Sequence, residues 1–138
     1  PEVYLVRQKM LEIGVDMLLD VHGDENLPYN FVAGAEGVPS YTTKMQQLED
    51  AFKAAMVLVT PEFQTEFGYG RDEPGKANLT VASNWVAEQF KCLAYTLEMP
   101  FKDNANLPDE AFGWSDVRSM KLGQDSLTAI LAVVDDLR

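Results

Sequence analysis

The chemistry that this sequence could perform is concentrated first around its single histidine. His22 follows the short apolar run 15–21 and precedes Gly23, a residue whose missing side chain would let a ligand come close. Neutral imidazole is the commonest metal ligand near pH 7, and Asp20 lies on the same side of the strand, where it could orient the ring. His22 is therefore a candidate metal ligand, although a lone histidine is more often simply a hydrogen-bonded polar residue.

Asp24 and Glu25 add two carboxylates directly after this segment. We expect them in a solvated acidic loop over 23–28. Together with Asp20 they could form an oxygen-rich patch for Ca²⁺ or Mg²⁺, but their spacing matches no EF-hand loop.

A second reactive candidate stands in Tyr95-Thr96-Leu97-Glu98, where a carboxylate ends an apolar run. Because Glu98 lies between Leu97 and Met99, its side chain must be exposed at the strand tip, paired, or raised in pKa. A carboxyl group of raised pKa at a strand end suits a general base. A glutamate that simply faces water fits the sequence equally well.

Helix and strand signals alternate along the chain. Apolar periodicity and breaking residues predict helices at 2–13, 41–59 and 78–90, a last helix after Ser115, and strands at 15–21, 29–33 and 93–97. This order indicates an α/β fold with a partial mixed, mostly parallel sheet flanked by helices. Parallel sheets are normally larger, so the strand count indicates that strands are missing.

Individual residues are expected to fix these elements. Gly14 would end the first helix, Ser40 would cap the helix at 41–59, and Pro100 would break the last strand after Glu98. Five residues are expected to be buried in the core, namely Met45, Phe52, Trp85, Phe90 and Cys92. The apolar side of the last helix is also expected to face the core, and it comprises Val117, Met120, Leu127, Ile130, Leu131, Val134 and Leu137.

Composition excludes several classes of function. The chain has 138 residues and a net charge of −11, which would repel the phosphate backbone of nucleic acid. No apolar run reaches the roughly 20 residues that span a bilayer. Cys92 is the single cysteine, which excludes a disulfide framework and suits a reducing compartment. The sequence starts inside an apparent helix, without Met, which indicates either a piece of a longer protein or a small domain with a processed Met.

Together the two reactive segments resemble the zinc carboxypeptidase family, and specifically its cytosolic carboxypeptidase-like branch. The resemblance rests on Asp20-Val21-His22-Gly23-Asp24-Glu25, on Leu27-Pro28-Tyr29-Asn30-Phe31 after it, and on Tyr95-Thr96-Leu97-Glu98. It implies that His22 is the last of the zinc ligands and that Glu98 is the catalytic base. It covers residues 1–138 as the C-terminal half of a single α/β/α catalytic domain whose N-terminal half, with the family's His-x-x-Glu motif, is absent.

The resemblance also implies a reaction and a substrate. Zinc would activate water, Glu98 would take its proton and pass it to the leaving amine, and a peptide or protein would lose its C-terminal residue. Tyr69, between two glycines, would cover the substrate, while Arg71 and Lys76 could bind an acidic side chain such as that of a C-terminal glutamate. With its single histidine, this chain is expected to be inactive alone. The branch implies a cytoplasmic location.

Two alternatives remain at this stage. A related zinc amidohydrolase of the aspartoacylase or desuccinylase type would share the architecture and act on a small acylated amino acid. A non-catalytic interaction module would instead use the acidic surface to recruit a basic partner.

Overall fold

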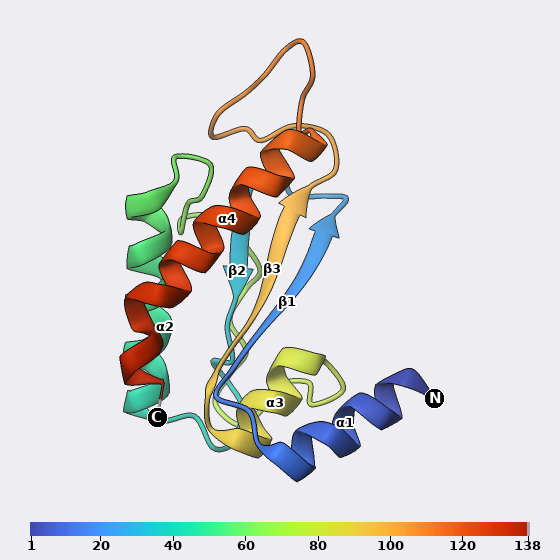
Figure 1. Ribbon diagram of the computed structural model, residues 1–138, viewed down its shortest axis with the longest axis vertical. Coiled ribbons are helices and arrows are strands. Elements are labelled where there is room, and N and C mark those ends of the chain that lie inside the picture. The colour runs from blue at the N-terminus through green and yellow to red at the C-terminus, as the bar shows by residue number, and fades with distance from the viewer. Residues whose placement is uncertain (138) are drawn as a thin grey trace.

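The computed structural model describes residues 1–137, which form a three-stranded sheet with helices on both of its faces (Figure 1). The strand order is β1-β3-β2, with β1 parallel and β2 antiparallel to β3. The elements, in chain order, are α1 (Glu2–Ile13), β1 (Met17–Asp24), β2 (Phe31–Ala33), α2 (Thr43–Val59), α3 (Ala82–Phe90), β3 (Leu93–Pro100), α4 (Asp116–Val133) and the short 3-10 helix η1 (Val134–Asp136). The predicted mixed sheet flanked by helices is confirmed.

The central strand β3 divides the core into two layers. Side chains alternate along a strand, so Leu93, Tyr95 and Leu97 point to one face of the sheet, where they meet α2 and α4. Ala94 points to the other face and packs against α3. By the same alternation Thr96 and Glu98 lie on the α3 face. The α2 and α4 side is closed by a large apolar cluster, whose buried helix residues are Leu48, Phe52, Met56, Leu122, Ala129 and Val133.

The ends of several elements differ from the prediction. β1 runs to Asp24 instead of ending at residue 21, and α3 begins at Ala82 instead of at residue 78. Thr42, not Ser40, caps α2, because its side-chain oxygen accepts the Met45 N–H, while the Ser40 N–H donates to Glu88. β3 continues through Met99 to Pro100, so the predicted break after Glu98 is wrong. Proline is tolerated there because it is the last residue of the strand and its missing N–H removes no internal ladder bond.

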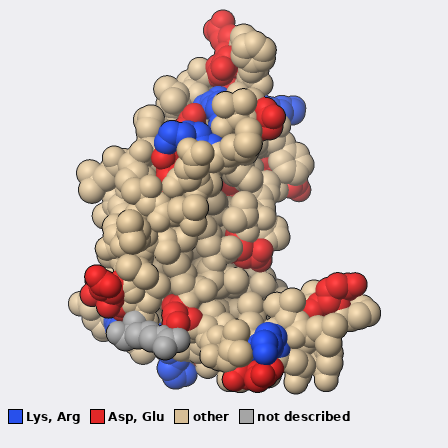
Figure 2. Space-filling model, in the orientation of Figure 1, with Lys and Arg blue, Asp and Glu red and all other residues tan. Residues whose placement is uncertain are grey.

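The predicted inward face of the last helix is also largely wrong. The buried residues of α4 include the small Ser126 and Ala129, and α4 packs against α2. Ile130 and Leu137 are partly buried against the core, whereas the rest of the predicted apolar side is exposed, namely Val117, Met120, Leu127, Leu131 and Val134. Figure 2 shows a broad area with few charges over α4, while charged side chains gather toward both ends of the molecule.

The other core predictions divide in the same way. Met45, Phe52 and Cys92 are buried as expected. Trp85 and Phe90 only flank the second layer, where their rings meet edge to face. None of the residues of α1 is buried. Within residues 1–137, no helix combines the length and the apolar character needed to cross a membrane.

Candidate active site

The strand register brings the two predicted reactive residues together. β1 runs parallel to β3, with His22 opposite Glu98 and Asp20 opposite Thr96. Neighbouring strands lie about 4.8 Å apart, and side chains at matched positions of a parallel pair share one face of the sheet. β2 adds Phe31 on the far side of Glu98. The imidazole and the carboxylate therefore project from adjacent strands on the α3 face.

Both side chains line one large cavity of about 1060 Å³. Asp20, His22 and Glu98 belong to its sheet wall. The opposite parts of the wall come from the irregular segment between α2 and α3, which contributes Tyr69 and Arg71. A volume of this size is typical of pockets that hold small organic ligands or the end of a peptide.

Glu98 is a buried carboxylate with unused hydrogen-bonding capacity. The residue is 6% exposed, and its Oε1 accepts from the Tyr69 hydroxyl at 3.2 Å. Its Oε2 is buried and has no hydrogen-bond partner within the described part of the chain. Burial raises the pKa of Glu98, an effect that the Tyr69 hydrogen bond and the nearby His22 oppose. A carboxylate in this state is suited to accepting and returning a proton.

The environment of His22 fits a single metal ligand. Its side chain is 51% exposed, and its Nε2 lies 3.0 Å from Asp20 Oδ1, which favours a proton on that nitrogen. The other ring nitrogen would then keep its lone pair for a ligand. Among residues 1–137 no group of three His, Cys, Asp or Glu side chains could hold a metal ion. The described residues thus offer His22 as one possible ligand and do not by themselves complete a metal site.

Asp24 corrects the expectation of a solvated acidic loop. It ends β1 with 5% exposure, and its Oδ1 accepts the N–H groups of Asn26 and Leu27, both at 2.6 Å. Its Oδ2 accepts the Tyr69 hydroxyl at 2.5 Å. The Tyr69 hydrogen bond lowers the pKa of Asp24, with help from the Leu27 N–H. An Asp that closes a turn on the N–H groups two and three residues later is a recognisable sequence signal, but its link to Tyr69 is not.

Solved structures of known proteins resemble this chain closely. A protein of Shewanella denitrificans OS-217, provisionally named carboxypeptidase A, is 62% identical, with a TM-score of 0.96 over 98% of this chain. A metallo-carboxypeptidase of Pseudomonas aeruginosa, in complex with (2-guanidinoethylmercapto)succinic acid, is 48% identical, with a TM-score of 0.97 over 100% of this chain. A metallo-carboxypeptidase of Burkholderia cenocepacia is 51% identical, with a TM-score of 0.93 over 98% of this chain. The resemblance to metallo-carboxypeptidases is confirmed.

The likeness extends over nearly all of this chain but over a limited part of each relative. The chain spans 36% of the length of each of these three metallo-carboxypeptidase-like structures. An uncharacterised protein of Zymomonas mobilis is 44% identical over 99% of this chain and 36% of its own length. No family model matches the sequence.

The two predicted cations of the loop differ in position. Arg71 lines the cavity, is 74% exposed, and lies 3.6 Å from the Glu36 carboxylate. Lys76 is exposed and does not line the cavity; its backbone N–H donates to the Glu73 carbonyl. The structure thus brings His22, Glu98, Tyr69 and Arg71 together and leaves Lys76 outside.

Sequence reasoning missed a further cation in the cavity wall. Lys53 of α2 lines the cavity, and its ammonium group lies 3.1 Å from Asp50 one turn earlier. Nothing in the sequence around Lys53 distinguishes it from a solvated helix lysine. Its position depends on how α2 is turned against the sheet.

The base of the segment that carries Tyr69 (residues 62–75, the Tyr69 loop) is firmly attached. The Gln64 amide nitrogen donates to the carbonyl oxygens of Asn30 and Phe67, and its amide oxygen accepts the N–H groups of Glu66 and Phe67. These bonds fix the chain beside β2 up to residue 67. The glycine-flanked Tyr69 follows directly.

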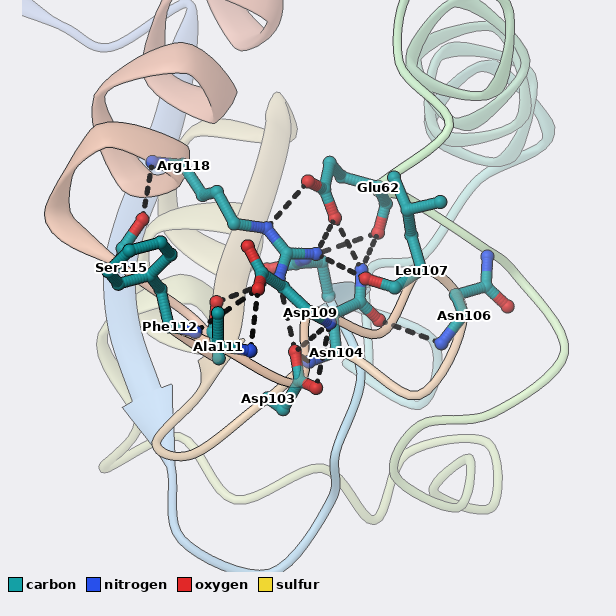
Figure 3. Close-up of polar contacts among 12 residues, drawn as sticks. Glu62, Asp103, Asn104, Asn106, Leu107, Asp109, Ala111, Phe112, Ser115 and Arg118 are labelled. Carbon is teal, nitrogen blue, oxygen red and sulfur yellow. Dashed lines mark hydrogen bonds and ion pairs between the residues drawn. The ribbon is translucent and has the colours of Figure 1, made fainter.

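The first residue of the Tyr69 loop joins a larger polar network (Figure 3). The Arg118 guanidinium donates to both carboxylate oxygens of Glu62, at 2.8 and 2.6 Å, and to Asp103 at 3.0 Å. Asn104, fully buried, donates to the Glu62 backbone and side chain. The network joins the connection between β3 and α4 to Glu62, the first residue of the Tyr69 loop. It therefore helps to hold the start of this loop in place.

Proposed function

We propose that this chain is a part of a zinc-dependent metallo-carboxypeptidase, in which His22 is a metal ligand and Glu98 is the general base. The observation that carries the proposal is the register of β1 and β3, which places imidazole and carboxylate side by side in one cavity. The buried Oε2 of Glu98 supports it, because this atom finds no hydrogen-bond partner among residues 1–137 and needs a water or substrate group to bond. Similarity to metallo-carboxypeptidases supports the reaction class.

In this proposal the chain's own residues position groups and move one proton. A bound zinc ion would supply a Lewis acid that polarises the scissile carbonyl and acidifies water. Asp20 holds the His22 ring in place through its Nε2. Glu98 accepts a proton from the attacking water and then donates it to the leaving amine, which its raised pKa favours. The Tyr69 hydroxyl lies 3.2 Å from Glu98 Oε1, so this tyrosine would cover the transfer once substrate is bound.

We further propose that the catalytic domain includes an N-terminal portion beyond residues 1–138, which supplies the other metal ligands. Three ligands are needed for a catalytic zinc, and His22 is the single histidine of the sequence. The chain's span of 36% of its relatives and the exposed apolar residues of α4 support this organisation. The isolated chain would then be inactive.

The single, buried cysteine suits the reducing cytoplasm, where we place the protein.

The substrate in this proposal is a peptide or protein with a free C-terminus. Arg71 at the cavity wall would bind an acidic side chain of the terminal residue, glutamate in the first place. Lys76 was predicted for the same role; from its exposed position in the Tyr69 loop it could act only on parts of a substrate outside the cavity.

The proposal is tested on the full-length protein that contains this chain. Purified enzyme is incubated with peptides that differ in their last residue and, in parallel, with N-acyl amino acids, and released amino acids are quantified by mass spectrometry. We expect release of a single C-terminal residue, fastest for glutamate, loss of activity with a chelator, and recovery with zinc. Hydrolysis of N-acyl amino acids alone would favour the amidohydrolase instead, and chelator-resistant peptide hydrolysis would contradict the metal.

A further inference from the structure

The hydroxyl group of Tyr69 meets two carboxylates inside the cavity. It lies 2.5 Å from Asp24 Oδ2 and 3.2 Å from Glu98 Oε1. Tyr69 as a residue is 52% exposed, and its ring touches Phe31 edge to face, at 4.9 Å between centroids. One edge contact on an exposed ring does not fix the hydroxyl, so its position depends on the two carboxylates.

The two carboxylates compete for a single proton donor. A tyrosine hydroxyl has one proton to donate and lone pairs that accept. Because Asp24 is closer than Glu98 by several tenths of an ångström, the proton is directed to Asp24. Glu98 Oε1, at 3.2 Å, then receives only the weaker share of the hydrogen bond from the Tyr69 hydroxyl. Asp24 therefore determines both where the hydroxyl lies and which way it points.

Asp24 is a rigid anchor for this contact. Its Oδ1 is committed to the turn that follows β1, and its backbone carbonyl accepts the Phe101 N–H at 3.2 Å. Within residues 1–137 its Oδ2 has one hydrogen-bond partner, the Tyr69 hydroxyl. The turn accounts for one oxygen of Asp24 and leaves the other for Tyr69.

The Tyr69 end of the contact is held less firmly, by the edge contact of its ring with Phe31 and by the exposed Arg71–Glu36 ion pair that follows it. The bonds of Gln64 reach only as far as Phe67. Gly68 and Gly70 flank the tyrosine; an added side-chain carbon would meet the Phe31 ring at 3.0 Å at Gly68 and no atom within 4 Å at Gly70. The backbone directly after Tyr69 thus has room to adopt other conformations once the hydroxyl is released.

We propose that Asp24 is a positioning residue that holds the Tyr69 hydroxyl beside Glu98 and so keeps the tip of the Tyr69 loop at the cavity. The effect on turnover rests on the proposed function, because it acts through Glu98. The contact itself is a property of residues 24 and 69 and does not depend on the reaction. The two parts can therefore be tested separately.

The contact is tested by chemical modification of Tyr69 in the full-length protein. Asp24→Asn keeps an oxygen for the turn and replaces the charged acceptor of the Tyr69 hydroxyl proton by an amide N–H₂, which can only donate. Nitration by tetranitromethane is followed peptide by peptide, with the exposed Tyr4 as internal reference. We expect Tyr69 to react faster by roughly tenfold or more, the factor expected on losing one hydrogen bond to a charged group. Asp135→Asn removes the same charge away from the cavity and should change nothing.

The effect on turnover is tested by a double-mutant cycle with Tyr69→Phe. Each single variant should lower kcat/KM by roughly tenfold, and the double variant should lose no more than either alone, because both remove the same contact. A purely structural role of Asp24 would instead give additive losses. If Asp24→Asn does not fold, Asp24→Ser replaces it, since a serine hydroxyl still closes the turn but cannot reach Tyr69.

The possible results separate the two claims. Unchanged nitration of Tyr69 in a folded Asp24 variant would overturn the contact. Faster nitration with unchanged kcat/KM in an active protein would overturn the positioning role. If the wild-type protein releases no C-terminal residue, the proposed function fails, while the nitration result still decides whether Asp24 holds Tyr69.

Discussion

Glu49 is a buried carboxyl group that should make the stability of the fold depend on pH. It lies in α2 with 2% exposure, its Oε1 accepts the Ala35 N–H at 2.8 Å, and its Oε2 accepts the Tyr41 hydroxyl at 2.6 Å. Burial raises the pKa of Glu49 to about 7, because two hydrogen bonds do not replace the lost hydration of the charge.

The sign and size of the effect follow from this shift. A carboxyl group whose pKa is higher in the folded than in the unfolded state favours folding when protonated. Its contribution is therefore complete below its ordinary pKa of 4.5 and is lost as the pH rises through about 7. The shift corresponds to about 3 kcal/mol in the free energy of unfolding, of which about 2 kcal/mol is lost between about pH 5.5 and 8.

Glu49→Gln should abolish this part of the pH dependence. Glutamine keeps a carbonyl oxygen for Ala35 and cannot ionise. Urea unfolding followed by tryptophan fluorescence at several pH values between about 5.5 and 8 gives the free energy of unfolding of both proteins. We expect the variant to gain about 2 kcal/mol over wild type across this interval. Glu110→Gln, which removes a charge from an exposed loop, should run parallel to wild type; parallel curves for Glu49→Gln as well would refute the reasoning.

Three other interior features give further tests. Arg118→Met should lower the free energy of unfolding by about 3 kcal/mol in urea, because Glu62 keeps a nearly buried charge without its partner; a loss below about 1 kcal/mol would contradict the network. Gly113→Ala should lower the free energy of unfolding by about 2 kcal/mol or more, because the φ of Gly113 is 61° and a Cβ would collide with a backbone carbonyl. Gly123→Ala, with open space in α4, should raise the free energy of unfolding by about 1 kcal/mol. Thermal unfolding of both variants tests these two expectations. Burial raises the pKa of Cys92 to about 11. The thiol of the native protein should therefore resist iodoacetamide at pH 7.5, whereas the thiol of the unfolded protein should react. Rapid labelling of the native form, measured by mass spectrometry, would contradict the burial of Cys92.

The parts of the fold that could be predicted from sequence are those fixed by local signals. Gly14 ends α1 where expected, and the apolar runs that became β1 and β3 are long enough to be recognised without context. The pairing of His22 with Glu98 could be anticipated because both residues follow such runs, and parallel strands end at a common edge.

The remaining features depend on contacts between distant segments. The buried side of α4 includes the small residues Ser126 and Ala129, and hydrophobicity along one helix does not reveal which side packs against α2 and the sheet. Asp24 was expected in solvent because its partner, Tyr69, is 45 residues away. Lys53 lines the cavity because of the way α2 is oriented. Other residues of α2 determine that orientation.

We propose that two adjacent strand ends have different roles, in which His22 binds the metal and Glu98 transfers the proton. The most direct measurement is the zinc content and the kcat of Glu98→Gln in the full-length protein, beside His22→Ala. The account predicts that Glu98→Gln keeps its zinc and loses activity by roughly 100-fold or more, while His22→Ala loses zinc itself. A Glu98→Gln variant that retains its zinc and turns over within a few-fold of wild type would contradict the account.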